Sequence, residues 1–450
     1  MTSNDRGQWK SRLGFIFAAA GSAIGLGNIW RFPYVVGENG GSAFLVVYLL
    51  MILFLGLPVL IGEVMLGKAS QRDPVGAFEV LDRKGSPWRL IGFMGVLAAF
   101  MILAFYSVVA GWCIEFIIRS LSGAFSPDAH PALAAQAFNV LTSSPEVQIY
   151  YLGFFLLMVV GIVYAGVQSG LQRWCEILMP LFLLILVALI FFAMTQPGAK
   201  EGVKFLLQPD WSKLDRDAVL AAMGQCFFSL SLGMGAMLTY GSYLRKEDNV
   251  VSSAAWVTSL DTGIAIFAGF AIFPIVFSFG IDPGHGPGLV FVSLPVAFQQ
   301  LPAGTIVALA FFVLLLAAAL TSAISLLEVI SAYFVDEFKM PRHLAAIMFG
   351  LICFLMGVGV TYSGKYLDFL DGVSAKYLLP LGALFISLFV GWRLDQKIAQ
   401  SEFADSKFAK VFKVWLFCVR FVAPVLIALV FLNKVGFFAW VARFSIEIVN

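Results

Sequence analysis

Charged residues are scarce in this chain. Lysine, arginine, aspartate and glutamate together make up 12% of its 450 residues, whereas 60% are hydrophobic and 45 are phenylalanines. So few polar side chains do not cover the surface of a water-soluble globule of this length. The composition therefore excludes an ordinary soluble domain and predicts an all-α polytopic membrane protein.

Cysteine and histidine are also rare, with five and three residues. Every cysteine falls inside an apolar run, where it is usually a small packing residue. No pair of cysteines lies in a loop, so neither a disulfide framework nor a metal cluster is expected. The sequence has no HExxH motif, P-loop or nucleophile elbow. We therefore expect no enzymatic activity.

Long hydrophobic runs are abundant. Eleven of them approach the ~20 residues that a helix needs to cross a bilayer. They are predicted at 13–37, 41–67, 88–121, 148–166, 171–195, 218–243, 250–280, 303–336, 343–361, 368–393 and 411–433. The tail 434–450 is too short for a confident twelfth span and is expected to end outside the cell.

The distribution of lysine and arginine predicts the orientation. If the N-terminus is cytoplasmic, the inner loops hold more than twice as many basic residues as the outer loops, in agreement with the positive-inside rule. Eleven spans then place the C-terminus outside. Residues 1–12 lack a cleavable signal pattern and form a cytoplasmic segment. We expect a multi-pass protein of the cell inner (plasma) membrane.

The first apolar run is interrupted by its own residues. Gly21, Gly25, Gly27, Asn28 and Arg31 lie where lipid would demand an unbroken apolar helix. An arginine near the middle of a span costs roughly 2.5 to 3.5 kcal/mol on insertion scales, so Arg31 is expected to face a carboxylate or a watery vestibule. Broken helices of this kind are typical of transporters.

A second interrupted run follows five spans later, between Gln225 and Ala236, and contains Gly233 and Gly235. Glycines that only allow close helix packing are one explanation of such a segment. Two matched interruptions favour another, a five-plus-five inverted repeat with its binding site near the bilayer midplane. The repeats are predicted at 13–195 and 218–393, followed by an extra span at 411–433.

Several short motifs accompany these interruptions. They are Trp9, Arg12-Leu13-Gly14-Phe15, Gly25-Leu26-Gly27-Asn28, Arg31-Phe32-Pro33, Glu38 to Phe44, Gly56-Leu57-Pro58, Phe228 to Gly233, Thr239-Tyr240 with Tyr243, Leu294-Pro295 with Phe298, and Leu320-Thr321-Ser322. With them the chain resembles the neurotransmitter:sodium symporter family, which is solute carrier 6-like, in its bacterial hydrophobic amino-acid branch. The resemblance covers nearly the whole chain and implies discontinuous first and sixth spans.

The resemblance implies an amino-acid site at the two interruptions. Its residues would be Ser22, Ala23, Gly25, Gly27, Ile102, Tyr106, Phe228, Ser229, Ser231, Met234, Ser322 and Leu326. Gly25 stands where monoamine-carrying relatives have an aspartate, and it leaves room for the substrate's own carboxylate. Met234 is flexible, so a range of hydrophobic amino acids, aromatic ones included, is the expected substrate class.

Two sodium sites are implied in the same way. The first would use Ala23, Asn28, Ser229 and Asp261, and the second Gly21, Ile24, Ala318, Thr321 and Ser322. Both sets present oxygen ligands, which suit a hard cation. Asp261 departs from the family pattern, which usually has asparagine at this position.

Asp261 also bears on the anion requirement. Chloride-dependent relatives bind the anion through residues that match Tyr48, Gln225, Ser229, Asp261 and Ala265. Here Asp261 supplies a negative charge of its own, and a buried carboxylate requires a cation or a proton as its partner. We therefore predict chloride independence, with proton exchange at Asp261 on the return step as an option that the residues leave open.

The resemblance further implies two gates. Arg31 would pair with Asp371 above a lid formed by Tyr106 and Phe228, and Arg6 and Trp9 would latch to Asp336 and Tyr243. Glu63 would support the interrupted sixth span. Gly170 and Pro180 match a motif that lets the fifth span of a bacterial relative unwind, although a helix cap and a tolerated kink explain the two residues equally well.

The sequence thus predicts a sodium-coupled symporter of hydrophobic L-amino acids that works by alternating access with two sodium ions. A proton-coupled carrier is the nearest alternative, because Asp261 can titrate. A non-transporting amino-acid sensor could share every ligand, but the chain offers no signalling domain. Oligomeric state and the preferred amino acid are not predicted.

Overall fold

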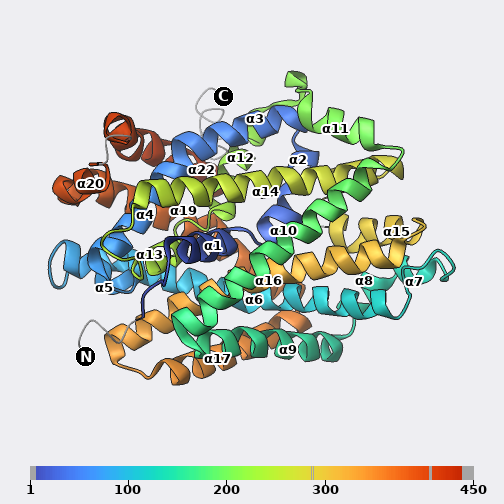
Figure 1. Ribbon diagram of the computed structural model, residues 1–450, viewed down its shortest axis with the longest axis horizontal. Helices are drawn as coiled ribbons and strands as arrows, with labels where there is room; N and C mark the ends of the chain where they lie inside the picture. Colours follow the sequence, from blue (N-terminus) through green and yellow to red (C-terminus); the bar gives the residue numbers. More distant parts are fainter. Residues whose placement is uncertain (1–6, 285, 287, 405–407, 438–450) are drawn as a thin grey trace, which may run out of the picture.

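The computed structural model describes residues 7–284, 286, 288–404 and 408–437. Every regular element in these ranges is a helix. In Figure 1 the long helices run along the longest axis of the molecule. Short helices mark its two ends, with α5 (Pro74–Leu81) and α20 (Gln396–Glu402) at one end and α7 (Ala132–Ala135), α11 (Ala199–Leu207) and α15 (Leu294–Gln299) at the other.

The predicted spans are present as helices. In the described part of the chain, nine helices are long and apolar enough to cross a membrane, and a bent pair makes a tenth span. The nine are built from α3 (Ser42–Met51) with α4 (Leu57–Ser70), α6 (Arg89–Leu121), α9 (Pro145–Tyr164), α10 (Arg173–Met194), α14 (Val250–Ser278), α16 (Gly304–Phe338), α17 (Arg342–Tyr362), α18 (Gly364–Val373) with α19 (Leu379–Leu388), and α21 (Phe412–Phe417) with α22 (Ala423–Lys434).

The first span is the bent pair. Helix α1 (Arg12–Ala23) begins where the Ser11 side chain accepts a hydrogen bond from the Gly14 N–H, and it ends before Ile24, whose backbone is extended. A π-helical turn at Gly27–Arg31 then leads into α2 (Phe32–Glu38). The two halves meet at 50°. The predicted interruption is therefore present.

The remaining predicted span, 218–243, is divided into α12 (Arg216–Ser229) and α13 (Ala236–Gly241). Between them Ser231, Gly233 and Gly235 have φ angles of +54°, +80° and +76°. An α-helix does not pass through left-handed residues, so the helix stops at this point. The interrupted sixth span accounts for the eleventh predicted segment.

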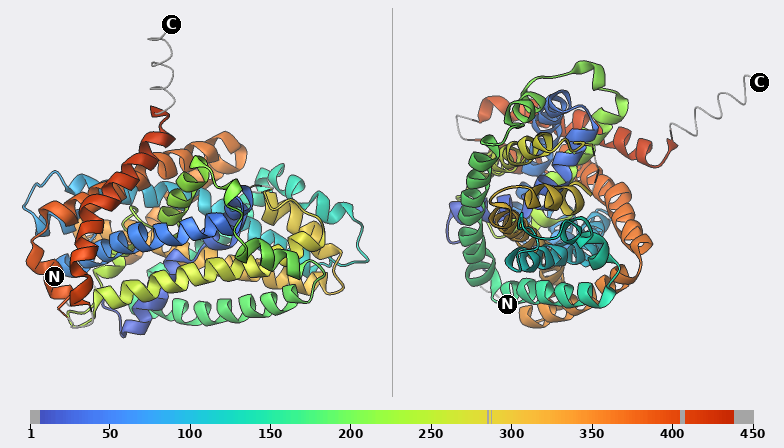
Figure 2. Two further views of the ribbon diagram at one scale, coloured as in Figure 1. Left: turned by 90° about the horizontal axis from the view of Figure 1, so that it is seen from above. Right: turned by 90° about the vertical axis from the view of Figure 1, so that its right-hand side faces the viewer.

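The two interrupted spans lie inside the bundle. Helix α1 packs against α10, α13, α14 and α16, and the longest helices, α6 and α16, pack against each other. The end-on view of Figure 2 shows outer helices arranged around these inner ones. The outer helices expose large apolar side chains, such as Leu157 and Phe191, each 72% exposed. Such an apolar surface is suited to lipid.

A close approach of α4 to α13 depends on Gly67. A Cβ at this position would lie 2.0 Å from the Leu238 carbonyl oxygen, whereas a Cβ at Gly161 on α9 would meet nothing within 4 Å.

We predict that Gly67→Ala lowers the free energy of unfolding by about 1–3 kcal/mol, because the two backbones have to separate. Gly161→Ala is the matched control and should be neutral or slightly stabilising. Thermal unfolding in detergent measures both, and equal midpoints for the two variants would contradict this packing account.

Candidate functional site

A narrow cavity of about 30 Å³ lies where the first and sixth spans are interrupted. It is lined by Ser22, Ala23, Gly25, Gly27, Ile102, Tyr106, Phe228, Ser231, Met234, Ser322, Ser325 and Leu326. Eleven of the twelve residues assigned to substrate by resemblance therefore surround one cavity. The twelfth, Ser229, faces Asp261 instead.

Glycine is required at two points of the cavity wall. A Cβ at Gly25 would lie 2.4 Å from the Ser322 Oγ and 2.9 Å from the Tyr106 hydroxyl, and one at Gly27 would lie 2.9 Å from the Phe228 ring. The Tyr106 hydroxyl accepts a hydrogen bond from the Leu26 N–H at 3.2 Å. Neutral hydroxyls and helix-end backbone groups thus meet here, a combination that can bind both ends of a zwitterion.

A buried carboxylate, Asp261, connects the two interrupted spans through hydrogen bonds. The Asn28 amide donates to Asp261 Oδ1 at 2.8 Å and to the Asp261 carbonyl at 3.0 Å, while Ser229 Oγ donates to Asp261 Oδ2 at 2.7 Å. All three residues are fully buried. Asp261 forms no ion pair with any basic side chain among the residues that the structure describes. A buried, hydrogen-bonded carboxylate without a basic partner fits a cation site.

A second cluster of oxygens lies between α1 and α16. The Ser322 hydroxyl is 3.1 Å from the Ser22 carbonyl and 3.5 Å from those of Gly21 and Ile24. The neighbouring Thr321 hydroxyl donates to the Ala318 carbonyl at 3.0 Å. The five residues of the predicted second sodium site are therefore neighbours in space, and their carbonyls and hydroxyls fit a hard cation.

Glu63 on α4 supports the interrupted sixth span. Its Oε1 accepts a hydrogen bond from the Gly233 N–H at 2.7 Å, and the side chain is fully buried. Its other oxygen has no hydrogen-bond partner in the described part of the chain. The contact satisfies a backbone donor that the broken helix releases.

An outer cavity of about 360 Å³ adjoins the narrow one. Arg31 and Asp371, predicted as a gate pair, both line it, and the Arg31 guanidinium lies 4.6 Å from the centre of the Phe228 ring. Tyr106 and Phe228 line both cavities. These two side chains are therefore the partition between the cavities, which is the place predicted for the lid.

The N-terminal segment closes the opposite end. The Trp9 indole donates to the Tyr240 carbonyl at 2.9 Å, and the Trp9 backbone N–H donates to the Tyr243 carbonyl at 3.1 Å. Trp9 is 1% exposed. Trp9 and Tyr243 are thus brought together as expected, whereas Arg6 lies outside the described residues. Asp336, at the end of α16, accepts a hydrogen bond from the Asp73 N–H at 2.9 Å.

The fifth span is helical throughout in this conformation. It begins with a π-helical turn at Val167–Gln172, which includes Gly170, and Pro180 lies inside α10. The N-terminal segment rests on this turn, because the Lys10 N–H donates to the Gln172 side chain at 2.9 Å. The Gln168 side chain in turn donates to the Gln8 carbonyl at 2.8 Å.

Two residues near these sites, Ser325 and Glu328, are not predicted from the sequence. Ser325 lines the narrow cavity and accepts a hydrogen bond from Ser22 Oγ at 2.7 Å. Glu328 is fully buried and binds Arg342 through two hydrogen bonds of 2.7 and 2.9 Å beside Tyr243. Signals for both existed: Ser325 lies one helical turn after Ser322, and Glu328 is an acidic residue inside an apolar run.

Comparison with known proteins decides the family. The model of the sodium:neurotransmitter symporter family matches residues 6–130 and 133–442. The chain belongs to this family. The symporter is 39% identical to an uncharacterized sodium-dependent transporter of Bacillus subtilis, over 95% of this chain and 98% of that protein. It is 37% identical to an uncharacterized sodium-dependent transporter of Haemophilus influenzae, over 96% of this chain and 100% of that one.

A solved structure is similar over almost the same length. The crystal structure of MhsT in complex with L-phenylalanine matches the symporter with a TM-score of 0.88 and 45% identity, covering 95% of this chain and 100% of that one. Members of the family are sodium-dependent membrane transporters and not enzymes. Membership of this family therefore confirms the expected fold class, the sodium dependence and the absence of enzymatic activity.

The contact between Glu63 and Gly233 generates a prediction. Glu63→Ala leaves the Gly233 N–H buried without an acceptor, which costs about 1–3 kcal/mol. Glu63→Gln keeps an acceptor oxygen in place and should retain most of the stability. Thermal unfolding of the purified protein compares the two variants. An alanine variant as stable as the glutamine variant would show that the Glu63 oxygen is not needed at this position.

Proposed function

We propose that the symporter imports hydrophobic L-amino acids, aliphatic and aromatic, together with sodium by alternating access. The observation that carries the proposal is the composition of the narrow cavity, where an uncharged polar end at Gly25, Tyr106 and Ser322 adjoins apolar side chains of Ile102 and Met234. The similarity to MhsT, solved with L-phenylalanine, supports it.

The substrate would lie across the two interrupted helices. Its carboxylate would lie next to Gly25, where no side chain covers the backbone, near the Tyr106 hydroxyl. Its ammonium group would bind carbonyl and hydroxyl oxygens near Ser22, Phe228 and Ser231. Helix dipoles favour this orientation, because helix starts attract anions and helix ends attract cations.

Two sodium ions would accompany the amino acid. Ala23, Asn28, Ser229 and Asp261 would hold one ion next to the substrate carboxylate, and Gly21, Ile24, Ala318, Thr321 and Ser322 would hold the other between α1 and α16. The buried Asp261 carboxylate already carries the negative charge that chloride supplies in chloride-dependent relatives. Transport is therefore proposed to be independent of chloride.

The two ends of the bundle would act as alternating gates. Arg31 and Asp371 would close the outer cavity over Tyr106 and Phe228, and Trp9 with the N-terminal segment would close the other end, which we take to be cytoplasmic. We place the protein in the cell inner membrane, with inverted repeats at 13–195 and 218–393 that move relative to each other. Sodium binding would favour the outward-open state.

Uptake into proteoliposomes tests the proposed function. An inward sodium gradient should drive accumulation of labelled L-phenylalanine or L-leucine, and replacing sodium by potassium should abolish it. Replacing chloride by gluconate should leave the rate unchanged. Uptake driven by a proton gradient alone would support the proton-coupled alternative, and substrate binding without flux would identify a sensor.

Loss of one oxygen ligand tests the second sodium site. Thr321→Val removes a hydroxyl without changing side-chain volume greatly, and we predict a roughly tenfold rise in the sodium concentration for half-maximal uptake, equivalent to about 1.4 kcal/mol. Thr361→Val is the control, because Thr361 makes a similar bond to its own helix, at 2.8 Å to the Val358 carbonyl. An unchanged sodium dependence in the Thr321 variant would exclude Thr321 as a ligand.

A further inference from the structure

One arginine lies inside the last apolar helix. Arg420 belongs to a π-helical turn, Cys418–Val422, near the middle of the span Ala409–Asn433. Its Nε–H donates to the Gly391 carbonyl, and the Trp392 indole donates to the Arg420 carbonyl at 3.3 Å. The Cζ atom of the guanidinium lies 5.6 Å from the centre of the Trp392 ring. Arg420 is therefore fixed against the last turn of the preceding span.

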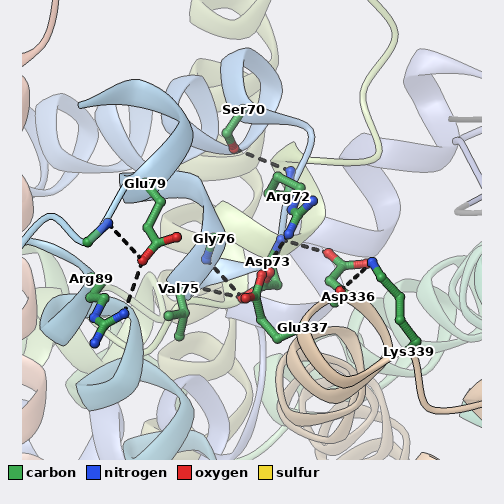
Figure 3. Close-up of polar contacts among 11 residues, drawn as sticks. Ser70, Arg72, Asp73, Val75, Gly76, Glu79, Arg89, Asp336, Glu337 and Lys339 are labelled. Carbon is green, nitrogen blue, oxygen red and sulfur yellow. Dashed lines mark hydrogen bonds and ion pairs between the residues drawn. The ribbon is translucent and has the colours of Figure 1, made fainter. Parts of the chain in front are cut away.

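The charge of Arg420 has no acidic partner in the described part of the chain. Two arginines at the same end of the bundle are paired, Arg72 with Glu337 at 2.7 Å and Arg89 with Glu79 at 3.1 Å (Figure 3). The two terminal nitrogens of Arg420 bind no other described residue, and neither is buried. They face the outside of the bundle, where a cation requires an anion from another molecule.

The depth of this guanidinium is set by the span that it contacts. Gly391 and Trp392 lie in the last turn of Gly364–Arg393. Trp392 is 61% exposed, and tryptophan is enriched where a bilayer meets water. A long arginine side chain can reach that interface from a backbone position inside the span. The guanidinium therefore lies at the level of the lipid headgroups.

The surface around the guanidinium is apolar in one direction and basic in the other. Phe417, Phe421 and Val425 are 57%, 47% and 59% exposed and follow each other at helical spacing. The Phe421 ring packs against Trp392 at 5.5 Å. Lys413 is exposed one helical turn before Phe417 and forms no ion pair among the residues described. A ligand that fits this surface has an anionic head and apolar chains.

We propose that Arg420, Trp392 and Lys413 bind the headgroup of an anionic phospholipid. The phosphate accepts hydrogen bonds from the two terminal nitrogens of the guanidinium, whose fork geometry suits it. Lys413 adds a second positive charge, and the acyl chains lie along Phe421 and Val425. Basic pockets between membrane helices bind such headgroups on the cytoplasmic side. The inference rests on the proposed function only in assigning this leaflet to the cytoplasm.

Native mass spectrometry of the full-length protein tests the site. The purified protein in detergent is titrated with phosphatidylglycerol or with phosphatidylcholine that carries the same acyl chains. Phosphatidylglycerol is expected to bind about tenfold more tightly, because two basic side chains face its net negative charge. Equal affinities for the two lipids would overturn the proposal.

Three variants locate the preference. Arg420→Gln should remove most of it, because glutamine keeps a donor for the Gly391 carbonyl but loses the charge. Arg393→Gln is the matched control and should behave as the wild type, because Arg393 lies beside Trp392 but its charge is bound by Asp82. Lys413→Gln, at an exposed position, should lower the preference about threefold and keeps the test decisive if Arg420→Gln does not fold. A full preference in both Arg420→Gln and Lys413→Gln would refute the site.

Two other occupants are outcomes of the same experiment. Inorganic phosphate at equal ionic strength should not displace phosphatidylglycerol, because it makes no contact with Phe421 and Val425. Phosphate adducts without lipid adducts would identify a site for the free anion and overturn the proposal. A dimer that Arg420→Gln dissociates, without lipid adducts, would identify a second copy of the chain as the occupant and would also overturn it.

Uptake separates this inference from the proposed function. A phosphatidylglycerol preference that Arg420→Gln removes, in a protein that shows no sodium-driven uptake, would leave the lipid site standing and refute symport. Sodium-driven uptake by a protein that binds the two lipids equally would refute the lipid site alone.

Discussion

Backbone groups released by two broken helices have to find partners in a region without water, and the rest of the structure depends on that constraint. The partners come from distant parts of the chain. Glu63 binds the Gly233 N–H, Tyr106 binds the Leu26 N–H, and the Gln225 amide donates to the Gly27 carbonyl at 3.0 Å. These contacts hold the two interruptions side by side.

The same constraint places polar chemistry at the centre of an apolar protein. Where the helices stop, carbonyls and hydroxyls accumulate around Ser322 on one side and around Asp261 on the other. A buried carboxylate without a basic partner is stable only with a cation or a proton. The need to satisfy Asp261 thus links the fold to the proposed sodium coupling, and the narrow cavity at the same two interruptions links it to the proposed amino-acid substrate.

Much of the fold follows from the length of hydrophobic runs and the position of glycines. The run predicted at 88–121 is the helix Arg89–Leu121, and the glycines at 25, 27, 233 and 235 lie at or beside the two breaks. The cavity residues could be named because motifs around those glycines resemble a known family. The pairing of Asp73 with Asp336 could not be predicted, because the two residues are 263 positions apart and their approach depends on how α5 packs against α16.

The central claim is that the site around the two broken helices is completed by sodium. It is tested most directly by equilibrium binding of labelled L-phenylalanine to the purified protein in sodium or in potassium at equal ionic strength. The account predicts saturable binding that requires sodium and tightens as sodium rises. Equal affinity in the two salts would contradict it, because the Asp261 and Ser322 oxygens would then be satisfied without the ion.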